Sequence, residues 1–133
     1  MALEVSVVTP ERELWSGEAT FVVARAAGGD IGVLPGHAPF LGALHHASLK
    51  IDGESGTEYF AVHGGFIEVF EDRVTVLAPL AEEAAEIDIE RARRDAEEYE
   101  ASLRNEFDEE IQMCLLRAQA RLRTAGEAGL IPG

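Results

Sequence analysis

The residues best suited to chemistry in this chain are three arginines in its C-terminal part, Arg91, Arg117 and Arg121. A chain that folds back on itself near residue 106 would place Arg121 opposite Arg91, and Arg117 opposite Asp95. Converging guanidinium groups would favour an anionic ligand, and their planar geometry suits phosphate. The simpler alternative is ion pairing between two helices, with Arg117 and Arg121 against Asp88 and Asp95. The residues alone leave both readings open.

Histidines offer the second kind of chemistry, a metal site. Residues His37 and His63, together with either His45 or His46, would form a three-histidine zinc or iron site inside a barrel. Adjacent residues on a strand point to opposite faces, so only one of the central pair can take part. Cys114, the only cysteine, falls on an apolar stripe where packing is its ordinary role. With no P-loop and no Gly-x-Ser-x-Gly motif either, we expect neither an enzyme nor a metal protein.

Composition limits the partners. The chain has 133 residues and a formal net charge of -14, so its surface would repel nucleic acid and anionic lipid. No apolar run approaches the ~20 residues of a membrane span, and the first four residues show no signal-peptide pattern. A single cysteine excludes an internal disulfide. We therefore expect an acidic, soluble, intracellular protein that neither binds nucleic acid nor inserts into a membrane.

Residues 1 to 84 show the pattern of short β-strands. Alternating and β-branched apolar residues are interrupted every few positions by Gly, Pro, Asp or Ser, without helical periodicity. This pattern favours an antiparallel sandwich or flattened barrel, with Trp15, Phe60 and Phe66 in its core. The expected strands cover residues 3–9, 13–15, 20–25, 40–44, 48–51, 58–62, 66–70 and 73–77.

One stretch, residues 28–40, combines four glycines and two prolines with the apolar Ile31, Val33 and Leu34. Glycine permits backbone conformations that other residues resist, and proline fixes φ. We therefore expect a chain reversal held in one shape, with its apolar centre turned inward. Asp30 and His37, its only ionisable residues, would flank that centre.

Helical periodicity begins near residue 88. From residue 81 to 125 there is no Gly or Pro, and apolar residues recur every three or four positions in two stripes. Asp88 and Asp108 are suited to capping two helices, with a break between residues 105 and 108. Since no glycine or proline enforces that break, one continuous helix of roughly 37 residues is the alternative. We expect the tail, residues 126–133, to be frayed. The stripes comprise Ile89, Ala92, Ala96, Tyr99 and Leu103, then Phe107, Ile111, Cys114, Leu115, Ala118, Leu122 and Ala125.

Five motifs follow one another along the chain: Val-Val-Thr-Pro at 7–10, Asp-Ile-Gly-Val-Leu-Pro-Gly-His-Ala-Pro at 30–39, Gly-Gly-Phe-Ile-Glu-Val at 64–69, Val-Thr-Val-Leu-Ala at 74–78, and Ile-Asp-Ile-Glu-Arg-Ala at 87–92. In this order and spacing the chain resembles, over nearly its whole length, the ε subunit of F-type ATP synthases. The acidic and then arginine-bearing helix pair strengthens the resemblance.

The resemblance implies an α+β fold, with a ten-stranded antiparallel β-sandwich in residues 1–84 and an antiparallel two-helix hairpin in residues 85–133. It implies a non-catalytic subunit of the central stalk, which couples rotation between the catalytic head and the c ring of a proton-translocating ATP synthase. The sandwich would bind the γ subunit and the polar loops of the c ring, with Asp30 and His37 as contact residues. The helices would switch to an extended form that reaches the α and β subunits and inhibits ATP hydrolysis. The chain would then be a peripheral protein at the cytoplasmic face of a bacterial cell membrane.

Some bacterial members of that family bind ATP in the compact form through an Ile/Leu-Asp-x-x-Arg-Ala motif and arginines on both helices. Glu98 departs from their pattern, which has an arginine at that position, and a carboxylate there would repel phosphate. A nucleotide-sensing module, with or without inhibition, is therefore a second function to test. The resemblance requires no cofactor, and it implies ATP as a regulatory ligand at Glu82, Ile87, Asp88, Arg91, Ala92, Arg117 and Arg121.

Overall fold

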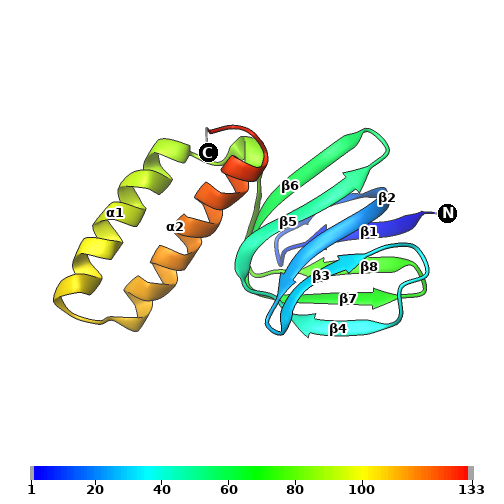
Figure 1. The fold of residues 1–133 in the computed structure, drawn as a ribbon, viewed down its shortest axis with the longest axis horizontal. Helices are drawn as coiled ribbons and strands as arrows, with labels where there is room; N and C mark the ends of the chain where they lie inside the picture. Colours follow the sequence, from blue (N-terminus) through cyan, green and yellow to red (C-terminus); the bar gives the residue numbers. More distant parts are fainter. Residues whose placement is uncertain (1, 132–133) are drawn as a thin grey trace.

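The computed structural model describes residues 2–131 and shows a β-sandwich beside two antiparallel helices (Figure 1). Helix α2 (Glu109–Glu127) lies between α1 (Ile89–Asn105) and the strands, and it contacts β5 and β6. The predicted sandwich and helical hairpin are therefore both present.

Among the described residues, nine strands form the sandwich rather than the ten expected. They are hydrogen-bonded in the order β4-β7-β8-β1-β2-β5-β6-β9, and β3 pairs with β2. The sheet is not wholly antiparallel, since β1 and β8 run parallel. The short helix η1 (Ala84–Glu86) follows the last strand. The strands are β1 (Leu3–Val8), β2 (Glu13–Ala26), β3 (Gly29–Val33), β4 (Phe40–Ala43), β5 (His46–Gly53), β6 (Gly56–His63), β7 (Phe66–Phe70), β8 (Arg73–Leu77) and β9 (Ala81–Glu83).

Strand β2 is one long strand where the sequence predicts two. Its first part pairs with β1 and its second part with β3 and β5, with an irregularity between Ala19 and Phe21. Gly17 does not form a turn here. A Cβ at this position would lie 3.1 Å from the Trp15 ring, so the missing side chain makes room for the indole.

The sandwich core is formed by apolar side chains that alternate along the strands. Phe60 is fully buried, as predicted, and so is Ile67. Phe66 was expected in the core, but its side chain is 55% exposed because it lies on the outer face of β7, next to the inward Ile67. Trp15 is partly buried and packs against the core.

The glycine-rich stretch is a strand followed by a loop, rather than a simple turn. Residues 29–33 form β3, and residues 34–39 connect it to β4. Gly36 has φ +86, and its N–H donates to Asp72 Oδ1 at 2.7 Å, so the loop is held to the β7–β8 turn. Val33 is buried, whereas Leu34 is exposed, so the apolar centre is only partly turned inward.

The Gly64-Gly65 pair marks a close approach between two backbones. Gly65 has φ +94, and a Cβ built there would lie 2.0 Å from the carbonyl oxygen of Leu77. No other residue fits at Gly65 without moving the backbone, because both its conformation and its surroundings exclude a side chain.

The two helices begin at the predicted caps. Asp88 Oδ1 accepts a hydrogen bond from the Arg91 N–H, and Asp108 Oδ1 accepts from the N–H groups of Glu110 and Ile111. The chain leaves helical geometry between Asn105 and Glu109, so this structure is the hairpin and not the continuous helix. No helix among the described residues is long and apolar enough to cross a bilayer.

The hairpin has a small apolar core of its own. Ala96, Leu115 and Ala118 are buried between the helices, with Tyr99, Leu103 and Leu122 partly buried against them. Phe107 belongs to the predicted apolar stripe, but it lies in the turn between the helices and is 71% exposed. With three small or medium side chains at its centre, the hairpin gains little free energy from apolar burial.

The expected fraying of residues 126–133 is wrong for its first part. Helix α2 continues through Gly126 to Glu127, and the Leu130 N–H donates to the Ala125 carbonyl at 2.9 Å. The Glu127 carboxylate lies 2.8 and 3.0 Å from the Ser48 hydroxyl of β5. This contact fixes the end of α2 on the sandwich, and residues 132–133 lie outside the described part.

Candidate functional site

A cleft of about 260 Å³ lies where the start of α1 meets α2 and β9. It brings together Glu82, Asp88, Arg91, Ala92 and Arg121, five of the seven residues that the resemblance assigns to an ATP site. Two further carboxylates, those of Glu86 and Asp95, complete the lining.

The other two predicted residues do not line the cleft. Ile87 is buried and is not part of the lining. Arg117 lies close enough to His46 to influence its ionisation, and its Nε is buried without a hydrogen-bond partner among the described residues. The expected convergence of three arginines is therefore limited to Arg91 and Arg121.

Arg121 and Glu82 form an ion pair that links α2 to the strands. Arg121 Nε donates to Glu82 Oε2 at 2.7 Å, and the same oxygen lies 3.0 Å from Nε2 of the buried His63. Burial alone would raise the pKa of the Glu82 carboxyl, but the hydrogen bonds from His63 and Arg121 outweigh it and hold the pKa below its ordinary value. Glu82 is therefore ionised at neutral pH.

The expected ion pairs of Arg117 and Arg121 with Asp88 and Asp95 are wrong. Arg121 pairs with Glu82, and Asp95 pairs with Arg91, one turn away on the same helix, at 3.8 Å. The reason is that α2 packs on the sandwich as well as on α1, which brings the strand carboxylate of Glu82 to Arg121.

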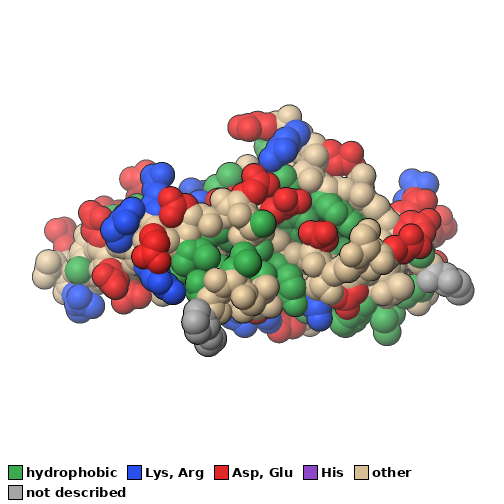
Figure 2. Space-filling view, turned by 90° about the horizontal axis from the view of Figure 1, so that it is seen from above, with side chains coloured by type: hydrophobic (Ala, Val, Ile, Leu, Met, Phe, Trp, Pro, Cys, Tyr) green, Lys and Arg blue, Asp and Glu red, His purple; other side chains and the backbone are tan. Residues whose placement is uncertain are grey.

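The cleft is not a ready-made polyphosphate site. Four carboxylates and two guanidinium groups line it, which leaves two negative charges. Its volume also lies below the roughly 300 Å³ of the smaller ligand pockets. Glu98 is not part of the lining. On the face that Figure 2 shows, acidic and basic side chains are intermingled over the helices and form no basic patch.

The histidines do not support the metal alternative. The rings of His46 and His63 lie 6.0 Å apart, and His63 is already engaged by Glu82. Burial lowers the pKa of His46, and the neighbouring His63, Arg117 and His45 lower it further. Within residues 2–131, no group of three or more His, Cys, Asp or Glu side chains is arranged to hold a metal ion.

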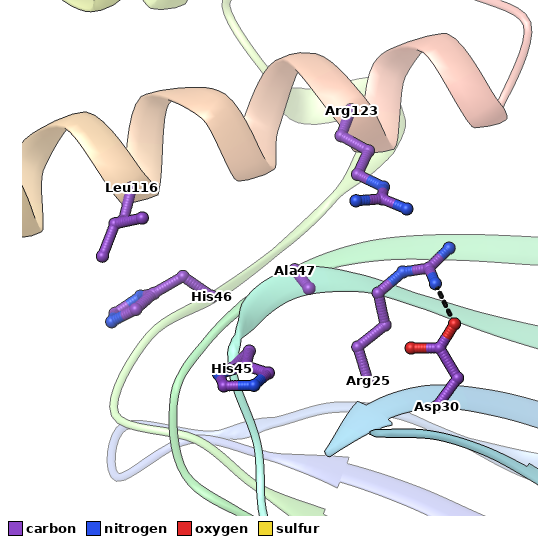
Figure 3. A pocket seen from close by; sticks show the side chains of 7 residues that line it. All are labelled: Arg25, Asp30, His45, His46, Ala47, Leu116 and Arg123. Carbon is purple, nitrogen blue, oxygen red and sulfur yellow. Dashed lines mark hydrogen bonds and ion pairs between the residues drawn. The ribbon is translucent and has the colours of Figure 1, made fainter. Parts of the chain in front are cut away.

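Asp30 and His37 lie at opposite ends of β3. Asp30 pairs with Arg25, its register partner on β2, beside the end of α2 (Figure 3). His37 lies in the 34–39 loop, which Asp72 holds at the far end of the strand. The structure does not bring these two residues together in one contact site.

An exposed apolar face on β4, β7 and β8 was not predicted from the sequence. Four of its side chains are at least half exposed: Leu41 (69%), Phe66 (55%), Phe70 (53%) and Leu77 (50%). The strand register places Phe66 beside Leu77, and Leu41 beside Glu68. The sequence of β7, Phe-Ile-Glu-Val-Phe, does indicate this face. It puts apolar residues on both faces of the strand, whereas a strand with one solvated face alternates between apolar and polar residues.

The fold and these surfaces define a two-part interaction subunit, a β-sandwich with an open apolar face and a helical hairpin docked through polar contacts. The family described as "ATP synthase, Delta/Epsilon chain, beta-sandwich domain" matches residues 2–84. The ATP synthase epsilon chain of Streptomyces coelicolor is 45% identical over 124 residues, covering 92% of this chain and 94% of that one. The Thermobifida fusca epsilon chain is 46% identical over 127 residues, covering 92% and 91%.

The chain therefore belongs to the family of ATP synthase epsilon chains. It is a non-catalytic subunit of that complex, which confirms the prediction that it is not an enzyme. Solved structures show the same fold at low sequence identity. A chain of the Euglena gracilis mitochondrial ATP synthase (OSCP/F1/c-ring, rotational state 1) superposes with a TM-score of 0.76 at 22% identity, covering 98% of this chain and 82% of that chain. One from the Tetrahymena thermophila mitochondrial enzyme, central stalk and c-ring, gives 0.59 at 14% identity, covering 96% of both.

Proposed function

We propose that this chain is the central-stalk subunit that joins the γ subunit to the c ring of a bacterial proton-translocating ATP synthase, and that its helices regulate ATP hydrolysis. The sandwich, residues 1–84, binds the stalk partners, and the hairpin, residues 85–133, is the regulatory part. The complex would place the chain at the cytoplasmic face of the cell membrane as a peripheral subunit. The observation that carries the proposal is the exposed apolar face on β4, β7 and β8.

The apolar face fits a permanent protein partner. Several large apolar side chains gathered on one open surface are unusual for a monomer and mark an interaction site. Helix α2 packs on β5 and β6 and leaves this face uncovered. We assign the face to the γ subunit.

Binding to the γ subunit tests this assignment with two matched substitutions. Phe66→Glu places a charge beside Leu77 on the apolar face, and Phe107→Glu makes the same change in the still more exposed turn of the hairpin. A large aromatic side chain that becomes buried in an interface contributes about 2 kcal/mol or more to binding, so Phe66→Glu should weaken γ binding about thirtyfold. Phe107→Glu should leave it unchanged. Normal γ binding by the Phe66→Glu chain, with its fold intact, would remove the assignment.

Asp30 and His37 remain our proposed contacts to the polar loops of the c ring. Because they lie at opposite ends of β3, they would make two separate contacts. His37→Ala should weaken coupling between hydrolysis and proton transport in the assembled enzyme without changing the stability of the subunit. Asp30→Lys also breaks the ion pair with Arg25. A loss of coupling in this variant therefore supports a contact with the c ring only if the stability of the subunit is unchanged.

The polar docking of the helices supports a regulatory switch. The α1–α2 core is small, and α2 is held to the sandwich through Glu82, Ser48 and Glu127. Contacts of this kind are exchanged for water or for other partners at modest cost. The released helices would then reach the α and β subunits of the catalytic head and obstruct rotation in the hydrolysis direction.

ATP sensing is a second candidate function, favoured by the five predicted residues that share the cleft. The cleft carries two excess negative charges, but among the described residues Arg121 contacts Glu82 only through Nε, which leaves its terminal nitrogens for phosphate. Calorimetric titration with Mg-ATP tests the site: Arg91→Ala should abolish the heat, and the exposed Arg93→Ala should not. No heat from the unmodified chain at millimolar ATP would exclude this function.

A further inference from the structure

A second pocket, of about 440 Å³, lies at the seam between α2 and the sandwich. Its lining comes from α2, from β2 and β3, and from the start of β5 with the residue before it (Figure 3). It shares no residue with the cleft described above. The lining residues are Arg25, Asp30, His45, His46, Ala47, Leu116 and Arg123.

Two guanidinium groups approach this pocket from opposite sides. Figure 3 shows Arg123 extending from α2 and Arg25 extending from β2 into the same space. The carboxylate of Glu127 lies between them, 3.1 Å from Arg123 Nε and 3.6 Å from Arg25 Nη2. Asp30 occupies the other side of the Arg25 guanidinium. Carboxylates therefore already sit at the edge of the pocket, which shows that its geometry suits anionic oxygens.

Donor capacity remains after these ion pairs. Arg123 uses only its Nε toward the described residues, so both of its terminal nitrogens make no ion pair or hydrogen bond with residues 2–131. Arg25 Nε and His46 Nδ1 are buried, and each lacks a hydrogen-bond partner among the same residues. Buried side-chain nitrogens without a partner are rare and indicate a bound water or ion.

All buried side-chain nitrogens that lack a partner in the described part of the chain occur around this seam. Besides Arg25 and His46 they belong to His63, whose ring lies 6.0 Å from that of His46, and to Arg117, whose charge acts on His46. The lining itself holds two arginines and one aspartate, and Glu127 contacts both arginines from its edge, so an anion that displaces Glu127 meets one uncompensated positive charge.

We propose that this pocket binds a small phosphate-class anion between Arg25 and Arg123, where it takes the place of the Glu127 carboxylate. Guanidinium groups suit phosphate because each presents two parallel donors at the spacing of two phosphate oxygens. The anion is inorganic phosphate or the phosphate group of a larger molecule. It joins α2 to the sandwich, so it binds only the docked hairpin and stabilises that form in proportion to its occupancy.

Titration of the full-length chain with sodium phosphate at constant ionic strength, followed by NMR of the arginine Nε–H and backbone N–H signals, tests the site. We expect saturable shifts at Arg25 and Arg123, with affinity in the millimolar range. Arg123→Ala should weaken binding about tenfold, as expected for the loss of hydrogen bonds to a charged group. Arg93→Ala is the matched control, because Arg93 is similarly exposed and likewise pairs with a glutamate one turn away.

The outcomes separate this pocket from the ATP cleft. Weakening by Arg91→Ala but not by Arg123→Ala would overturn the proposal, since the phosphate would then bind in the cleft. Shifts that grow linearly with phosphate, or equal loss in Arg93→Ala, would also overturn it. If phosphate binds saturably and a nucleoside monophosphate binds no more tightly, the ligand of the pocket is inorganic phosphate. If the nucleoside monophosphate binds more tightly through the same two arginines, the ligand is the phosphate group of a larger molecule. Circular dichroism of Arg123→Ala confirms that the variant is folded.

Discussion

The ion pair between Arg121 and Glu82 should control whether α2 stays docked on the sandwich. Replacing Glu82 with glutamine keeps the shape of the side chain but removes the charge that Arg121 and His63 share. Both charged side chains are about one-quarter exposed, 25% for Arg121 and 27% for Glu82. The pair therefore lies between a surface ion pair, worth up to about 1 kcal/mol, and a fully buried one, whose disruption costs roughly 3–5 kcal/mol.

We expect Glu82→Gln to make docking of α2 on the sandwich less favourable by about 2 kcal/mol at pH 7, the usual value for a hydrogen bond between charged groups. Such a change increases the undocked population of the hairpin about thirtyfold. Hydrogen exchange of the α2 backbone amides measures this population directly. Glu90→Gln is the control, since the Glu90–Arg93 pair is exposed on α1 and should change exchange little.

The effect should depend on pH in one direction. The pKa of Glu82 is lowered in the folded chain from an ordinary value of 4.5, so the unfolded or undocked form binds the proton more tightly. The stabilisation is thus complete above pH 4.5 and is lost as the pH falls through the lowered pKa. Wild type and Glu82→Gln should converge in acid. Equal exchange of α2 in the two proteins at pH 7 would refute the role assigned to this pair.

Three other substitutions test the physical account of the fold. Gly65→Ala should destabilise the sandwich by about 3 kcal/mol or more, because its Cβ meets the Leu77 carbonyl; Gly28→Ala, which meets nothing within 4 Å, should not change the melting temperature. The lowered pKa of His46 means that its protonation below pH 6.5 favours the unfolded chain. The melting temperature of His46→Gln should therefore fall less below pH 6.5 than that of the wild type, and equal pH profiles would contradict this. Asp108→Ala removes two capping hydrogen bonds and should destabilise α2 by about 1 kcal/mol. Hydrogen exchange should show this loss in α2 alone, and an equal effect in both helices would contradict the prediction.

Features set by neighbouring residues could be predicted from the sequence. Both caps, at Asp88 and Asp108, occur where the predicted helices begin, because capping involves residues only two or three positions apart. Most strands also lie where alternation places them. Strand β2 differs because Gly17 accommodates the Trp15 ring instead of ending a strand, and periodicity alone does not distinguish these roles.

Features set by packing between distant segments could not be predicted. The partner of Arg121 is Glu82, 39 positions away, because α2 packs against the sandwich as well as against α1. Gly126 suggested a frayed tail, yet the contact between Glu127 and Ser48 keeps the end of α2 helical. The separation of Asp30 from His37 follows from the strand β3 between them, which the glycine content of the stretch concealed.

Reconstitution of an ATP synthase depleted of its own epsilon chain tests the central claim most directly. The full chain and a chain ending at residue 84 are added to the depleted enzyme, and ATP hydrolysis and proton pumping are measured together. Both chains should restore coupled pumping, and only the full chain should suppress hydrolysis. If the chain ending at residue 84 binds the enzyme but hydrolysis is the same with either chain, the helices do not inhibit. If the full chain restores no coupling, it is not the subunit that joins γ to the ring.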